Sequence, residues 1–205
     1  MASRPEVIFE DSWTRIINGD VLEVLGSSLV PVSGIQMAMT SVPYLRQRKY
    51  IDTAWGQEAT VKEWLDRMYE MCTAIQKVIK PNGAFWFNAG DKWGGTVPKK
   101  ELTPDRVNRQ GNLMMLPERV VMRLTDEQRF TLINKVIWWK RNRAVQSFPK
   151  KFIDMWEPLY FLVKNADNYK FNRAEVGVET RGEMAVMSLI EPDEDQEFKE
   201  QMTLH

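Results

Sequence analysis

The residues Ser41-Val42-Pro43-Tyr44 could together bind and orient a polar, planar molecule. They directly follow residues 34–40, a nearly all-apolar run that predicts a central strand covered on both faces. In an open α/β sheet, ligands bind just outside the carboxyl ends of the strands. The hydroxyl of Ser41, a backbone carbonyl and the ring of Tyr44 would then lie together at such an end. Taken alone, the tetrapeptide is more typical of a strand that ends in a proline turn.

The composition excludes several kinds of chemistry. The only histidine is His205 and the only cysteine is Cys72, which lies on the apolar stripe of a predicted helix. A Ser-His-Asp triad, a His-rich metal site and a disulfide framework are therefore not expected. The 28 basic side chains balance the 28 acidic ones, so any contact with nucleic acid must come from local patches. The single cysteine and the lack of a membrane-spanning apolar run favour the cytoplasm.

The apolar periodicity predicts an α/β sheet of about five strands, with helices between them. Apolar residues recur at helical spacing from Ala59 to Lys80, and Pro81-Asn82-Gly83 predicts the end of that helix. Strands are predicted at residues 13–18, 34–40, 84–89, 131–139 and 159–163, with a helical turn at 21–25 and a helix beginning at Pro117. Residues 92–112 read as a long exposed loop, and residues 191–197 as an acidic tail.

Five segments resemble, in order, the motifs of amino-group DNA methyltransferases, which methylate exocyclic nitrogens of cytosine or adenine. The tetrapeptide resembles the family's Thr-Ser-Pro-Pro-Tyr motif. The other segments are Asn18-Gly19-Asp20-Val21-Leu22, residues 80–91 with their final Asn88-Ala89-Gly90-Asp91, residues 137–142 (Ile-Trp-Trp-Lys-Arg-Asn), and residues 157–164 followed by Tyr169-Lys170-Phe171. They cover residues 13–172. The chain resembles the permuted class that begins with the catalytic half.

The resemblance implies that residues 1–172 form a catalytic domain with the Rossmann-like fold of S-adenosylmethionine-dependent methyltransferases. Residues 173–205 would be a C-terminal segment that is shorter than in the family and ends in an acidic tail. The resemblance also implies that Ser41 Oγ and the Val42 carbonyl accept the two N–H groups of the target amine, while Tyr44 stacks on a flipped-out base. Ser41 favours cytosine N4 and leaves adenine N6 open. Methyl transfer to a cytosine carbon needs a thiolate, whereas transfer to an amine does not, which agrees with Cys72 being expected in the core. Val42 departs from the family, where proline is usual.

The cofactor half of the family pattern is incomplete. The resemblance implies that Asp20, Thr40, Asn88 and Asp91 contact S-adenosylmethionine. After Asn172, however, no strand-then-glycine-loop motif occurs, although such a loop normally approaches the methionine part of the cofactor. Three explanations of this incomplete pattern remain open. The chain could be one half of a split enzyme that a second chain or a homo-oligomer completes, or an inactive relative that binds DNA or regulates a complete enzyme. It could also be a minimal enzyme whose cofactor site is built differently. The first is preferred because the incomplete sheet would leave a central strand with an unpaired edge.

Basic residues near these segments are candidates for contact with DNA phosphates. They are Arg46, Arg48 and Lys49 after the tetrapeptide, then Lys140, Arg141 and Arg143, with Lys150 and Lys151 beyond. The alternative is a solvated loop. Trp138, Trp139 and Phe148 could stack on bases, although aromatic residues in strands more often belong to the core.

Overall fold

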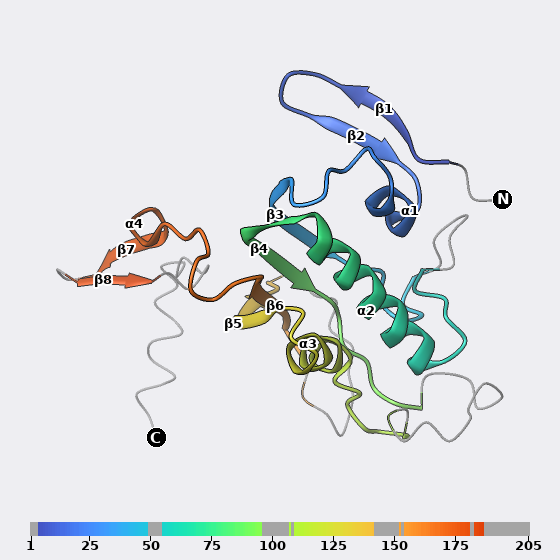
Figure 1. Ribbon diagram of the computed structural model, residues 1–205. Helices are drawn as coiled ribbons and strands as arrows, with labels where there is room; N and C mark the ends of the chain where they lie inside the picture. Colours follow the sequence, from blue (N-terminus) through green and yellow to red (C-terminus); the bar gives the residue numbers. More distant parts are fainter. Residues whose placement is uncertain are drawn as a thin grey trace.

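The computed structural model describes residues 4–48, 55–95, 107, 109–141, 152, 154–180 and 183–186. Its main feature is a sheet of four strands in the order β3-β4-β6-β5 (Figure 1). The strands are β3 (Ile35–Ser41), β4 (Ile79–Asn88), β5 (Thr131–Trp139) and β6 (Trp156–Val163). β3 and β4 run parallel, whereas β6 is antiparallel to both β4 and β5. The carboxyl ends of β3 and β4 therefore meet at one end of the sheet.

Two helices, α2 (Val61–Val78) and α3 (Leu116–Asp126), pack into the main core on one face of this sheet. The apolar stripe of α2 includes Trp64, Met68 and Cys72, all fully buried against sheet residues such as Phe85. Thr60 caps this helix by accepting a hydrogen bond from the Glu63 amide. The helix predicted over residues 59–80 is confirmed, and so is the start of a helix at Pro117, which lies in the first turn of α3.

The helix ends before Pro81-Asn82-Gly83, as predicted, but residues 81–83 already lie inside β4. The backbone becomes extended at Ile79, directly after α2, so β4 begins earlier than the expected residue 84. Gly83 allows the two parallel strands to approach closely. A Cβ atom at this position would lie 2.8 Å from the carbonyl oxygen of Gln36 in β3.

β3 is an edge strand of the described sheet, which corrects the expectation of a central strand covered on both faces. The second face of the sheet carries a small cluster of Ala84, Phe161 and Val163, and this cluster does not extend over β3. Met37 and Met39 are consequently 56% and 65% exposed. The apolar character of β3 thus exceeds what the described residues bury.

The predicted strand at 13–18 pairs outside the main sheet. β1 (Glu6–Glu10) and β2 (Arg15–Asn18) form a separate antiparallel hairpin followed by α1 (Val21–Gly26) (Figure 1). Among the described residues the main sheet therefore has four strands and not the expected five. The chain continues from β6 through α4 (Arg173–Val176) into a second hairpin, β7 (Gly177–Thr180) and β8 (Glu183–Val186). Within the described ranges, no helix combines the length and the apolar character that crossing a membrane requires.

Candidate active site

Ser41 and Asn88 are the last residues of two parallel strands and lie opposite each other in register. The Ser41 hydroxyl donates a hydrogen bond of 2.8 Å to Asn88 Oδ1. Asn88 is 2% exposed, and its Nδ2 donates to the Pro158 carbonyl at 2.9 Å, which fixes the amide group. Because the hydroxyl proton of Ser41 points at Asn88, the lone pairs of Ser41 Oγ are left to accept hydrogen bonds from a bound molecule.

Tyr44 is held on two sides. Its hydroxyl lies 3.0 Å from Asn88 Oδ1 and 2.8 Å from Glu157 Oε2 on β6. Glu157 in turn pairs with Lys140 Nζ at 3.0 Å. The ring packs against Gly90, where a Cβ atom would meet Tyr44 Cδ2 and Cε2 at 2.4 Å. The position of the Tyr44 ring is therefore set by three residues, Asn88 and Gly90 at the end of β4 and Glu157 on β6.

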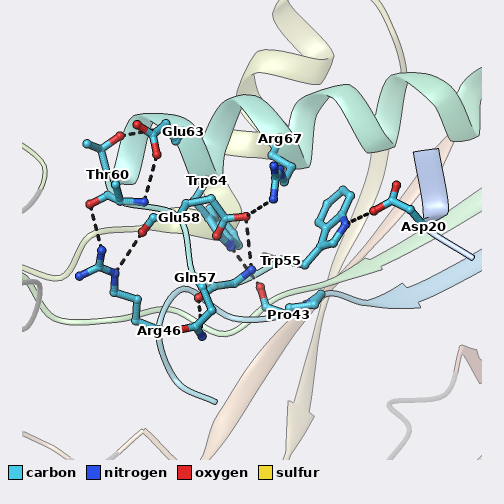
Figure 2. A network of polar contacts seen from close by, with 12 residues as sticks. Asp20, Pro43, Arg46, Trp55, Gln57, Glu58, Thr60, Glu63, Trp64 and Arg67 are labelled. Carbon is cyan, nitrogen blue, oxygen red and sulfur yellow. Dashed lines mark hydrogen bonds and ion pairs between the residues drawn. The ribbon is translucent and has the colours of Figure 1, made fainter. Parts of the chain in front are cut away.

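The backbone around Val42 is also fixed. The Val42 amide donates to the Asn88 carbonyl at 3.2 Å, a hydrogen bond that a proline could not make. The next carbonyl, that of Pro43, accepts from the Trp64 indole of α2 at 3.0 Å (Figure 2). Valine at position 42 thus lacks the backbone rigidity of the family's proline, but its amide makes a hydrogen bond to Asn88 that proline could not make.

Two of the predicted cofactor residues are engaged as helix caps. Asp20 Oδ1 accepts from the Leu22 amide at the start of α1, and its Oδ2 accepts from the Trp55 indole at 2.6 Å (Figure 2). Asp91 accepts from the Met115 and Leu116 amides at the start of α3, at 2.9 and 3.0 Å. Burial raises the pKa of Asp91, although these backbone donors oppose the shift.

A third predicted cofactor residue, Asn88, holds Ser41 and Tyr44 as described above. The fourth, Thr40, precedes Ser41 on β3 and is half-buried. Asp20, Asn88 and Asp91 are thus each held by hydrogen bonds within the chain. Contact of the four residues with S-adenosylmethionine stays a prediction.

The predicted DNA contacts have different surroundings. The Arg46 guanidinium donates to the carbonyls of Glu58 and Ala59, which joins the chain after Tyr44 to the segment before α2 (Figure 2). Lys140 pairs with Glu157, and its Nζ lies 3.5 Å from the centroid of the Trp138 ring. Arg141 lies over Trp139 and Arg48 is exposed. Lys49, Arg143, Phe148, Lys150 and Lys151 lie outside the described residues.

A cavity of about 240 Å³ opens beside Tyr44 at this end of the sheet. Its lining combines aromatic rings, carboxylates and one lysine among the described residues. The residues are Tyr44, Gln47, Gly90, Asp91, Leu113, Met115, Glu118, Lys135, Asp154, Trp156, Glu157 and Pro158. The sequence did not single out Glu118, Lys135 or Trp156, because they are brought to the cavity from α3, β5 and β6 only by the fold.

Residues 35–198 match a family model described as DNA methylase, of the N6 and N4 type. The chain is 30% identical over 168 residues to the type II methyltransferase M.SfiI of Streptomyces fimbriatus, covering 78% of this chain. It is 22% identical over 175 residues to the DNA adenine methyltransferase YhdJ of Escherichia coli, covering 84% of this chain. The chain belongs to this DNA methylase family.

A solved structure supports the fold. The cytosine-N4-specific PvuII DNA methyltransferase matches 77% of this chain with a TM-score of 0.58 and 22% identity. The four-stranded sheet with its two covering helices is thus the Rossmann-like fold expected from the sequence. The chain spans only part of these proteins: 38% of M.SfiI, 49% of YhdJ and 51% of the PvuII structure.

Proposed function

We propose that this chain forms the target-amine half of a DNA methyltransferase that acts on an exocyclic amine, with S-adenosylmethionine as methyl donor. The observation that carries the proposal is the hydrogen bond from Ser41 to Asn88, which leaves an oriented acceptor at the ends of β3 and β4 beside the ring of Tyr44. Family membership gives the class of reaction. Cytosine N4 is the favoured target and adenine N6 the alternative.

The arrangement answers the main physical difficulty of this reaction. The lone pair of an exocyclic amine is delocalised into the ring, so the nitrogen is a weak nucleophile. Acceptors fixed at both N–H groups favour a pyramidal nitrogen and stabilise the positive charge that develops on it. Ser41 Oγ would be one acceptor and the Val42 carbonyl the other. Tyr44, held by Asn88 and Glu157, would stack on a base taken out of the duplex.

The described residues would hold only part of S-adenosylmethionine, because no strand-then-glycine-loop motif for its methionine part follows Asn172. The carboxylates of Asp20 and Asp91 accept hydrogen bonds within the chain and keep further lone pairs that could accept from the cofactor. The proposal therefore includes a second protein chain that completes the cofactor site. The open edge of β3, with the exposed Met37 and Met39, supports this part. A cytoplasmic location, expected from the single cysteine, belongs to the same proposal.

We expect the isolated chain to bind S-adenosylmethionine weakly, with a Kd above about 100 μM. This Kd corresponds to a binding free energy of roughly 5.5 kcal/mol at most. The reason is that the glycine loop that would approach the methionine part of the cofactor is absent after Asn172, so Asp20 could hold only the adenosine end. Isothermal calorimetry on the purified chain measures this directly. Low-micromolar binding by the chain alone would show that it carries its own cofactor site, and the second chain would then be unnecessary.

The target base is tested with the completed enzyme, meaning this chain together with the polypeptide that supplies the cofactor site. DNA treated with this enzyme and labelled S-adenosylmethionine is digested, and the modified nucleosides are separated by mass spectrometry. We expect N4-methylcytosine. N6-methyladenine as the only product would correct the base and keep the reaction class. DNA that is bound but never methylated would favour an inactive DNA-binding relative.

A further inference from the structure

The indole of Trp55 makes a contact to which the proposed function assigns no role. Its Nε1 donates a hydrogen bond of 2.6 Å to Asp20 Oδ2, across 35 positions of the sequence (Figure 2). Asp20 Oδ1 accepts from the Leu22 amide at 2.9 Å, so each carboxylate oxygen has a donor among the described residues. A carboxylate offers about four lone pairs, and the others are left to accept from a bound molecule. Asp20 is half-buried, which leaves it within reach of such a molecule.

The ring of Trp55 is itself fixed. It is 8% exposed and belongs to the main core. The Arg67 guanidinium of α2 lies over the ring, 5.2 Å from its centroid (Figure 2). Arg67 in turn pairs with the buried side chain of Glu58 at 3.4 Å. An indole held in this way presents its N–H group in one direction, toward Asp20.

The backbone after Trp55 is anchored to the tetrapeptide. The Gly56 carbonyl accepts from the Arg46 amide at 2.6 Å. A Cβ atom at Gly56 would lie 3.0 Å from the Tyr44 carbonyl oxygen and 3.0 Å from Pro43 Cβ, which measures how closely the two segments approach. Trp55 is therefore fixed at its ring and at its backbone, and the Asp20 carboxylate takes its orientation from a rigid donor.

We propose that Trp55 is a positioning residue, which holds the Asp20 carboxylate in the orientation that accepts a hydrogen bond from the adenosine part of S-adenosylmethionine. This inference rests on the function proposed above. Adenosine carries amino and hydroxyl donors, which suit a carboxylate acceptor. A side chain that is already ordered before binding spares the cost of ordering it during binding. Without the indole donor, only the Leu22 amide would hold the carboxylate, which could then turn about that single contact.

The test uses adenosine as the probe and the isotope-labelled full chain, so it does not depend on methyl transfer. The Trp55 indole N–H and the Leu22 amide both donate to Asp20, and their NMR signals report on its carboxylate. We expect both signals to shift as adenosine is added to millimolar concentration. Asp20→Asn keeps a capping oxygen but lacks the charge, and it should weaken adenosine binding at least about tenfold. Trp55→Phe, followed at Leu22, should weaken it about fivefold, the order expected for one side chain that must be ordered on binding.

Trp64→Phe is the matched control for adenosine binding. Trp64 is also a buried tryptophan, but its indole donates to the Pro43 carbonyl and not to Asp20. The control should bind adenosine as the parent does, and thermal unfolding shows which variants are folded. If Trp55→Phe does not fold, the shifts in the parent and their weakening in Asp20→Asn decide.

A folded Trp55→Phe chain that binds adenosine as tightly as the parent overturns this inference. So does a parent in which neither signal moves. Methyl transfer to DNA by the completed enzyme tests the proposed function separately, so that the failure of one is distinguishable from the failure of the other.

Discussion

Replacing Asn88 with alanine should reduce methyl transfer by the completed enzyme about a hundredfold, within the range seen when one preorganised polar contact is removed from an active site. The Asn88 amide orients the hydroxyl of Ser41 and contacts the hydroxyl of Tyr44, so a single truncation disturbs an acceptor and an aromatic platform together. The measurement is steady-state transfer of tritium from S-adenosylmethionine to DNA. The loss should appear mainly in kcat.

The double variant Asn88→Ala/Ser41→Ala separates orientation from general damage. If Asn88 acts through Ser41, the double variant should be little slower than Asn88→Ala, because the two changes remove parts of one unit. If the rate losses caused by Asn88→Ala and Ser41→Ala multiply in the double variant, the two residues act independently and Asn88 does not act through Ser41. Since Asn88 Nδ2 also bonds the Pro158 carbonyl, the variant should lose about 1–3 kcal/mol of stability, which a denaturant titration will show.

Gly90→Ala should also reduce transfer about a hundredfold, because it displaces the ring of Tyr44. The added Cβ would lie 2.4 Å from two ring carbons, so the ring, the backbone or both must move. Misplacing a group near the reacting atoms by about 1 Å can cost this much in rate. The same transfer assay measures the effect, and a fluorescent base analogue at the target position reports whether the base still stacks.

Gly26→Ala is a suitable control, because a Cβ at Gly26 meets no atom within 4 Å. It should leave transfer unchanged. Full activity in a folded Gly90→Ala enzyme would show that the close packing of Tyr44 is not needed for the reaction. Tyr44 would then have to be tested by its own truncation.

The sequence predicts the scaffold better than the roles of polar side chains. The periodic stripe of α2 and the alternation of strands and helices are local signals, and they correctly locate the helix and most strands. Asn88 was assigned to the cofactor because it lies in a family motif. Its contact with Ser41 joins residues 47 positions apart and depends on the register of β3 and β4, which sequence spacing does not specify.

Asp20 and Asp91 show a different kind of limit. Each was matched to a family motif, yet each is also an aspartate whose carboxylate caps a helix. For Asp20 the helical turn beginning at Val21 was a visible capping signal. For Asp91 no local signal existed, because the helix that it caps begins 25 residues later. Glu157 lies within a family motif, but its hydrogen bond with Tyr44 spans 113 positions and has no local signal.

The open edge of β3 has a consequence for the life of the protein in a cell. An apolar strand with one unpaired edge is a template for pairing with any other exposed strand, including that of a second molecule. On the proposal that a second chain covers this edge, a chain made in excess of that partner would tend to aggregate or be degraded. The amount of this protein would then be set by the supply of the proposed partner and not by its own rate of synthesis.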